Sequence, residues 1–262
     1  MFRNLVSAIL NGYKFFTMRR SMLLCMLASL IGSSYAQNSP GIPVISASAA
    51  TDSVTIQNPF FNNDLTDLFK TDIAELPIGF IGNKFQRFQI IFTEIKKSDT
   101  SSSTYIIKGK NKVKSNVCDF TGTANITNVT FSNPPTVTGY PKAGNIGTLT
   151  GTYLFKEDTT QKHVGTLQGN FMIRFYQSTD KKITIDDWTI NSDSTYSNNQ
   201  YIGTWKSYDG KTTQTCNFGT LRIPESGDLD VGRKEFQPND KYKDNGWQTY
   251  GSLLNTDWWK IK

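Results

Sequence analysis

The sequence predicts an all-β protein whose single antiparallel sheet coils strongly and closes into a barrel of about eight to ten strands. Three observations predict this fold: a doubled glycine motif, a second hairpin with a two-residue turn, and a composition rich in Thr, Asn, Gly and aromatic residues. A two-sheet β-sandwich is the alternative that the same patterns allow. One short helix is expected before the first strand.

The doubled motif is Gly-Thr-Leu-x-Gly-x-aromatic, which occurs at 147–153 and again at 165–171. Apolar and polar residues alternate through and beyond both copies, and a period of two indicates strands with one apolar face. Each copy places two glycines on that face. Glycine weakens a strand unless the strand bends tightly or another backbone approaches closely, and both conditions arise in a small closed barrel. We therefore expect a hairpin with its tip at 157–162 and its glycines on the concave side.

The first 36 residues are typical of a secretory signal peptide. Two arginines precede an apolar run from 22 to 31, and small residues lead to a cleavage site after Ala36. The run is too short to span a bilayer. Met1 and Met18 are both candidate start sites. The sequence thus predicts export through the inner membrane to the periplasm, the exterior or the cell surface, with no transmembrane segment in the mature chain.

The leader also accounts for most of the positive charge. Of 28 basic residues four lie within 1–36, which leaves 24 against 22 acidic residues and a net charge of +2 for the remaining chain. This near balance gives no support to nucleic-acid binding through a basic surface.

Two cysteines remain after the leader, Cys118 and Cys216. An exported chain with an even count permits a disulfide, and two buried thiols are the alternative. The bond would close a loop of about 97 residues and stabilise the fold by roughly 3–5 kcal/mol.

The mature chain divides into a flexible lead-in at 37–58 and a single β domain at 59–262. Near residue 59 the composition shifts, and Asn63 or Asp64 is expected to cap a short helix that ends before Pro77. We predict that this helix packs as a plug or lid on a barrel mouth or sheet edge, through the apolar residues Leu65, Leu68, Phe69 and Ile73.

Alternation predicts strands at 85–96, 105–114, 118–126 and 182–188. Beyond 126 the alternation switches parity, which indicates a bulge or a new strand near Asn128. The second of these strands has a row of lysines on its polar face. We interpret this row as a solvated or blunted edge rather than as a contact for an acidic partner; it comprises Lys108, Lys110, Lys112 and Lys114.

The second hairpin spans 201–218 around Asp209-Gly210, the signature of a two-residue turn. Its expected register places Tyr201 opposite Phe218, Trp205 opposite Gln214 and Gly203 opposite Cys216. The chain from 221 onward is less periodic, and we expect an ordered loop followed by a last strand or a packed tail.

Several motifs in this half resemble a family of secreted bacterial β proteins of unknown function. They are NNQYIGTW at 198–205, CNFG at 216–219, RIP at 222–224, GDLD at 227–230 and GW at 246–247. The resemblance implies no activity, substrate or catalytic residue. Residues 147–153 and 203–205 are also loosely similar to strand motifs of avidin and lipocalin-type barrels, which implies no particular ligand.

No nucleophile–base pattern points to catalysis. His163 is the only histidine and lies at the hairpin tip, and no Gly-x-Ser-x-Gly elbow accompanies it. We interpret it as a solvated turn residue. A histidine-based zinc site is disfavoured because zinc takes several His or Cys ligands.

Acidic residues on two loops suggest two further hypotheses. Asp228, Asp230 and Glu235 lie on a Gly/Pro-rich loop and offer oxygen ligands for calcium, although the EF-hand pattern is incomplete. The alternative is that these aspartates bond their own turn amides. No other cofactor is expected.

A carbohydrate-active enzyme is the second hypothesis that these acids suggest. Asp186 and Asp187 precede Trp188, and glycoside cleavage needs two carboxylates beside a sugar. Pairing either of them with Asp228 or Glu235 requires the two loops to meet.

Aromatic residues on the inner face either fill a core or line a ligand cavity. We favour core filling. A cavity would take a small apolar or sugar ligand at the residues Trp205, Tyr201, Tyr153, Phe171 and Trp188.

The function that the sequence predicts is therefore a secreted or periplasmic, non-catalytic binding or structural module. The alternatives are the carbohydrate-active enzyme and a cell-surface assembly component whose partner is another surface protein.

Overall fold

The computed structural model describes residues 59–70, 76–132, 144–187, 196–233, 235–251 and 257–260. Its strands are β1 (Ile78–Ile81), β2 (Gln86–Lys97), β3 (Thr104–Val113), β4 (Asn116–Ser132), β5 (Asn145–Glu157), β6 (Gly165–Gln177), β7 (Ile183–Ile185), β8 (Asn198–Ser207) and β9 (Thr213–Thr220). The helical segments are η1 (Pro59–Asn62), α1 (Thr66–Phe69), η4 (Gly227–Leu229), η5 (Asp240–Asn245) and η7 (Trp258–Lys260).

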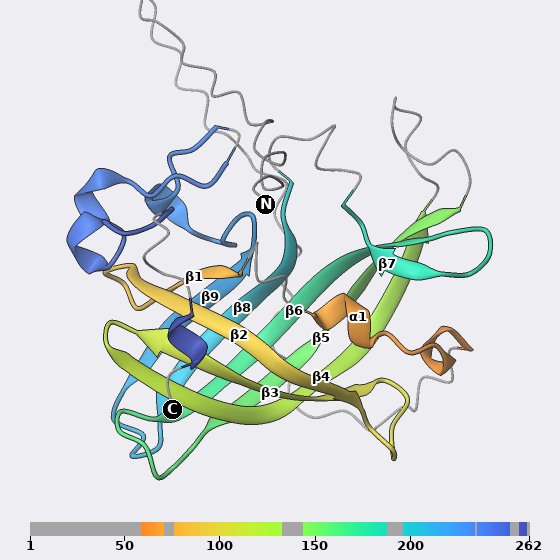
Figure 1. Cartoon of the computed structure of the whole chain (residues 1–262), viewed down its shortest axis with the longest axis horizontal. Helices are drawn as coiled ribbons and strands as arrows, with labels where there is room; N and C mark the ends of the chain where they lie inside the picture. The colour runs from red at the N-terminus through yellow and green to blue at the C-terminus, as the bar shows by residue number, and fades with distance from the viewer. Residues whose placement is uncertain are drawn as a thin grey trace, which may run out of the picture. The chain divides into compact units, whose positions relative to one another are not determined.

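All nine strands belong to one antiparallel sheet, in the order β5-β4-β3-β2-β1-β9-β8-β6-β7 (Figure 1). A further pairing between β5 and β6 closes the sheet into a ring, with β7 added beside β6. The predicted all-β, single-sheet fold is confirmed, and the two-sheet alternative is not formed. No helix in the described ranges is both long and apolar enough to cross a membrane.

The doubled glycine motif forms the predicted hairpin, β5 paired with β6. Three of its four glycines face an aromatic residue across the pair, as Gly151 does Phe171 and Gly169 does Tyr153. A Cβ atom at Gly151 would lie 2.7 Å from the Phe171 ring and 2.1 Å from the carbonyl oxygen of Asn125. The glycines thus leave the space on the concave side that the facing rings occupy.

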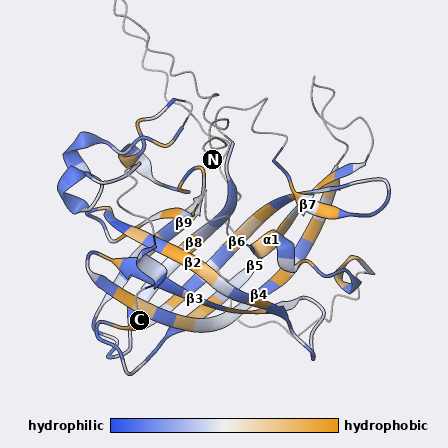
Figure 2. Cartoon of the chain, viewed as in Figure 1, coloured by the Kyte–Doolittle hydropathy of each residue, from blue (hydrophilic) through white to orange (hydrophobic). Residues whose placement is uncertain are grey.

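Aromatic rings fill the middle of the ring of strands. Tyr201 and Phe218 stack with their centroids 4.4 Å apart and their planes 9° apart, and Tyr153 meets both edge to face. Figure 2 shows the underlying alternation as hydrophobic and hydrophilic bands along the strands. Core filling, the interpretation that we favoured, is confirmed for this central part.

The predicted helix is confirmed but shorter than expected. The N-cap position is Leu65, which has no capping side chain, so the prediction of Asn63 or Asp64 as the cap is wrong. The Asp64 carboxylate nevertheless accepts hydrogen bonds from the Thr66 amide (2.9 Å) and hydroxyl (2.6 Å) at the start of the helix. α1 ends at Phe69 because Lys70 adopts an extended backbone, with ψ at 136°. Ile73, which we placed on the same helix, lies outside the described residues.

η1 and α1 plug one end of the ring, as predicted. Their apolar side chains join the main core, and Phe69 packs 4.9 Å from Tyr105, ring to ring. The Tyr105 hydroxyl accepts a hydrogen bond from the Leu65 amide at 2.9 Å. From the end of β2, the Lys97 ammonium donates to the carbonyl oxygens of Phe61 and Asn63 at 2.6 and 2.8 Å. This end is therefore closed by apolar packing and fixed by hydrogen bonds.

The strand predictions hold with three differences. β4 runs on to Ser132 through a register shift between Ile126 and Asn128, which confirms the bulge. β1 is a strand that we did not predict. β7 is only three residues long, and Trp188 lies outside the described residues. In the β8–β9 hairpin the pairs Tyr201–Phe218 and Trp205–Gln214 are those expected.

The chain after β9 packs as a tail on the outer face of the ring, through short 3₁₀ helices rather than a last strand. Its apolar residues form a second core with Phe80, which points outward from β1; the others are Ile223, Leu229, Phe236 and Trp247. Buried amides join this tail to the sheet: the Asn217 side chain donates to the Pro224 carbonyl (3.2 Å), and Gln200 donates to that of Arg222 (2.9 Å).

The predicted disulfide is not formed, because Cys118 and Cys216 are both free, buried thiols. They lie on β4 and β9, which are not neighbours in the sheet, so the topology separates them. Burial raises the pKa of the Cys118 thiol to about 11 and raises that of Cys216 as well. Neither thiol is therefore ionised at neutral pH. The two cysteines are therefore buried residues of the fold and not the two halves of a disulfide.

Candidate functional site

The end of the ring opposite the plug is open. Three turns border it: residues 82–85 between β1 and β2, 114–115 between β3 and β4, and 158–164 between β5 and β6. The β8–β9 hairpin contributes Trp205 and Gln214. Together they enclose a cavity of about 810 Å³, which we call the mouth cavity. Its volume lies within the range of small-molecule sites.

The floor of the mouth cavity is apolar. Ile81, Phe88 and Val113, from β1, β2 and β3, line the cavity together with the Trp205 indole, and all four belong to the main core or pack against it. Trp205 packs closely over Gly165, where a Cβ atom would lie 2.9 Å from the indole ring. The glycine at the start of the second motif copy thus allows the indole to lie flat against β6.

Glu157 is the central polar residue of the mouth cavity. It continues the inward positions of β5 after Tyr153 and Phe155, and its side chain is only 4% exposed. Its carboxylate accepts three hydrogen bonds, from Asn111 Nδ2 (2.6 Å), the Gly165 amide (2.6 Å) and Trp205 Nε1 (2.9 Å). Burial raises the pKa of this carboxyl group, and the three donors oppose that shift.

These contacts make Glu157 a positioning residue as well as an acceptor. They fix the Asn111 amide and the edge of the Trp205 indole, and Asn111 itself is 2% exposed. A carboxylate has about four acceptor sites, and these three donors occupy most of them.

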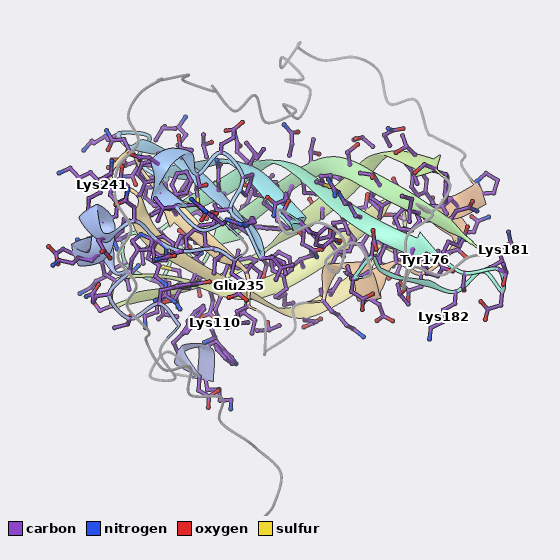
Figure 3. All side chains as sticks on the ribbon, turned by 90° about the horizontal axis from the view of Figure 1, so that it is seen from above. Lys110, Tyr176, Lys181, Lys182, Glu235 and Lys241 are labelled. Carbon is purple, nitrogen blue, oxygen red and sulfur yellow. The ribbon has the colours of Figure 1, made fainter. Side chains whose placement is uncertain are left out.

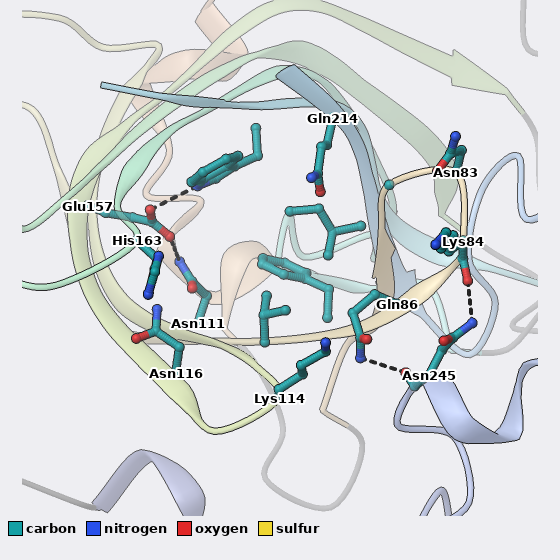
Figure 4. Close-up of a pocket in the computed structure, with 15 residues that line it drawn as sticks. Asn83, Lys84, Gln86, Asn111, Lys114, Asn116, Glu157, His163, Gln214 and Asn245 are labelled. Atoms are coloured by element: carbon teal, nitrogen blue, oxygen red, sulfur yellow. Dashed lines mark hydrogen bonds between the residues drawn. The ribbon is translucent and has the colours of Figure 1, made fainter. Parts of the chain in front are cut away.

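The rim of the mouth cavity carries amides and cations. Lys84, Lys114 and His163 are its basic residues, and Figure 4 shows Glu157 and His163 across the opening from Asn83 and Lys84. The remaining rim side chains are amides: Asn83, Gln86, Asn116, Gln214 and Asn245. Amides donate and accept hydrogen bonds, so the rim can bond the hydroxyl groups of a polar ligand.

The tail braces this rim from outside the ring. Asn245, at the end of η5, donates to the Lys84 carbonyl at 2.6 Å and accepts from Gln86 Nε2 at 2.6 Å. Trp247 Nε1 donates to the Phe85 carbonyl at 2.7 Å. The β1–β2 turn is therefore held in place by a segment far away in sequence.

The predicted ligand-binding residues lie in two different parts of the structure. Trp205 lines the mouth cavity, whereas Tyr153, Tyr201 and Phe171 lie in the filled core at 3% exposure or less, which corrects their assignment as cavity residues. Their rings pack against one another and leave the cavity only at the end of the ring. Trp188 lies outside the described residues.

His163 has a larger part in the site than the sequence indicated. It is exposed at the hairpin tip, as predicted, with a left-handed backbone at φ 55°. It nevertheless lines the mouth cavity, because the β5–β6 turn borders the opening.

Two of the three carboxylates proposed for calcium are directed to other partners. Asp228 pairs with Lys241 and accepts from the Tyr242 hydroxyl at 2.7 Å. Asp230 pairs with Arg222 at 2.5 Å. Glu235 is exposed. Within the described ranges no group of three His, Cys, Asp or Glu residues is placed to hold a metal ion.

The alternative reading of these aspartates describes Asp230 correctly. Its Oδ1 accepts hydrogen bonds from the backbone amides of Gly232 (2.9 Å) and Gln237 (3.2 Å), so this carboxylate serves its own loop.

The two acidic loops of the glycosidase hypothesis lie far apart. Lys181, in the turn before β7, and Lys241, which pairs with Asp228, lie at opposite ends of the molecule's long axis (Figure 3). Figure 1 separates β7 from η5 in the same way. The strand β7, which Asp186 and Asp187 follow in the sequence, is therefore separated from the loop that carries Asp228.

The mouth cavity combines an apolar floor, one buried carboxylate and a rim of amides and cations. Among its described lining residues Glu157 is the only acid, whereas glycoside cleavage uses two carboxylates. An apolar floor with an aromatic face, a fixed acceptor and a ring of amides can orient a small molecule without reacting with it.

Comparison of the sequence with protein-family models and with curated proteins found no match, and comparison of the fold with solved structures found none.

Proposed function

We propose that this protein is an exported, non-catalytic binding protein whose ligand is a small neutral sugar held in the mouth cavity. Export is the expectation that the leader at 1–36 carries. The observation that supports binding is the mouth cavity itself, open at one end of a ring whose other end is plugged.

The composition of the cavity favours a sugar. The pyranose ring has an apolar face that packs on an indole, and Trp205 presents such a face with its Nε1 already bonded to Glu157. Hydroxyl groups both donate and accept, and so do the five rim amides. A fatty chain offers no hydrogen bonds, so the amide groups that the protein does not itself bond would lose water without gaining a partner.

Titration with a panel of neutral mono- and oligosaccharides, followed by intrinsic tryptophan fluorescence and by calorimetry, tests the proposal. We expect saturable binding that Trp205→Leu weakens by about tenfold or more, because stacking and area burial are lost together. Lys206→Gln, whose side chain points outward from the same strand, is the matched control and should bind like the wild type.

Binding of a long-chain fatty acid but of no sugar would contradict the proposed ligand class. Product formation from an oligosaccharide would contradict the non-catalytic assignment and favour the carbohydrate-active alternative. An unchanged affinity in Trp205→Leu would place the site elsewhere.

A further inference from the structure

A second hollow lies on the outer wall of the ring, between the tail and strands β2 and β3. It has a volume of about 300 Å³, and we call it the basic cleft. Gln89 and Lys112 are direct partners across β2 and β3, and both point outward. Arg87 and Lys114 lie two residues further toward the open end and line the same hollow. Two neighbouring strands thus place three cations in one concave surface.

Arg87 is held in position without a carboxylate partner. Its Nη1 is within hydrogen-bonding distance of the Gly246 carbonyl (3.4 Å) and the Thr249 hydroxyl (3.3 Å), and the guanidinium lies 5.8 and 5.6 Å from the ring centroids of Trp247 and Tyr250. Burial lowers the pKa of Arg87, yet guanidinium stays charged at neutral pH.

No carboxylate of the described chain forms an ion pair with this guanidinium. A charge removed from water is normally paired.

The lysine row at 108–114 contains both ion-paired and unpaired lysines, which allows a comparison with Arg87. Lys108 pairs with Glu94 at 2.8 Å and Lys110 with Asp119 at 3.3 Å, so half of the lysine row is neutralised. Lys112 and Lys114 have no such partner within the described residues. Asp244 is the one acid that lines the basic cleft, which leaves an excess of two positive charges there.

We propose that the basic cleft binds a tetrahedral oxyanion, phosphate or sulfate, either free or as the ester of a larger molecule. Arg87 offers a planar fork that matches two oxygens, and Lys112 and Lys114 add charge from β3. The Gln89 side chain adds a neutral donor at the same surface. A doubly charged anion offsets the excess of two charges, which a single carboxylate would only halve.

The test is calorimetric titration of the full chain with inorganic phosphate and with inorganic sulfate, in Hepes at an ionic strength held constant with chloride. We expect saturable one-to-one binding that Lys112→Gln/Lys114→Gln weakens by about tenfold or more. Lys96→Gln/Lys108→Gln is the matched control: it removes the same charge from the outer faces of β2 and β3, where both lysines are ion-paired and exposed. This control should bind like the wild type.

Absence of saturable binding, or equal weakening by both double variants, would overturn the proposal, because equal weakening indicates only diffuse charge. Lys112→Gln alone distinguishes the cleft from the mouth cavity, since Lys112 lines the cleft only. Trp205→Leu should leave phosphate affinity unchanged, so failure of sugar binding and failure of anion binding are separate results.

A phosphate monoester, glucose 6-phosphate, identifies the source of the anion. Equal affinity for the ester and for inorganic phosphate supports a free ion. A tighter ester whose advantage disappears in Trp205→Leu supports a ligand that reaches from the basic cleft into the mouth cavity past Lys114, which lines both.

Discussion

The two ends of the ring differ in how the interior of the sheet is covered. At one end the plug covers the strands with apolar side chains, and the polar groups there are bonded within the protein. At the other end turns border a cavity, and a carboxylate is buried at its edge. The comparison teaches that closing a sheet does not by itself create a binding site. The mouth cavity lies where none of the described segments covers the core.

The largest expected effect separates the two ends by stability. Phe69→Ala removes a fully buried ring from the plug and should lower the free energy of unfolding by about 3–5 kcal/mol. Val113→Ala, at the floor of the mouth cavity, should cost about 1 kcal/mol because that side chain already borders open space. Urea unfolding followed by tryptophan fluorescence measures both. Equal losses would mean that the mouth is packed as tightly as the plug.

A smaller effect shows how the plug is fastened. Tyr105→Phe leaves the buried Leu65 amide without its acceptor and should cost about 1–2 kcal/mol. Tyr201→Phe is the matched change at the middle of the core, where the hydroxyl has no hydrogen-bond partner in the described structure. Its stability should be unchanged or higher, since an unsatisfied polar group is removed. The same urea titrations compare the two variants, and a loss in Tyr201→Phe equal to that in Tyr105→Phe would contradict the difference.

The smallest effect is a pH dependence of opposite sign at the two ends. Hydrogen bonds from Thr66 lower the pKa of Asp64 beside the plug, so its contribution to stability is present above its unfolded pKa and is lost as pH falls through the folded value. Burial raises the pKa of Glu157, so native Glu157 holds its proton more tightly. Its contribution is present below the unfolded pKa and is lost as pH rises through the raised value.

Unfolding free energies measured from acid to neutral pH for Asp64→Asn and Glu157→Gln check these signs. Asp64→Asn should be less stable than the wild type at neutral pH, and this difference should disappear at low pH. Glu157→Gln should gain stability relative to the wild type as pH rises. Glutamine suits this comparison because the Asn111 amide can turn to face it, which keeps the hydrogen bonds while the charge is removed. Parallel curves for both variants would contradict the opposite signs.

Most of the sheet follows from local pattern. Alternation located β2 to β6, the Asp209-Gly210 turn set the register of β8 and β9, and the parity switch marked the bulge near Asn128. β1 was not predicted because a strand of four residues is too short for an alternation of period two to show in the sequence. The packing of the tail was not predicted in detail because its apolar residues are buried against Phe80, which points outward from β1, the strand that was not predicted.

The mouth cavity was not predicted, although one signal for it existed. Glu157 continues the inward positions of Tyr153 and Phe155, and a carboxylate at an inward position is unusual enough to mark a site. We assigned it to the hairpin tip instead. Its partners Asn111 and Trp205 come from strands distant in sequence, so only the closed sheet brings the three together. Cys118 and Cys216 are likewise separated by the strand order of the sheet, which the number of cysteines in the sequence does not reveal.

The pairing of β1 with β9 has a kinetic consequence. The earliest strand of the sheet finds one of its two neighbours only when the latest strand exists, as in the match of Ile81 with Cys216. Such a contact has a long loop to close, and loops of that length slow folding. During synthesis from the N-terminus, β1 therefore lacks this neighbour until β9 has been made, and the ring of strands cannot close before that point.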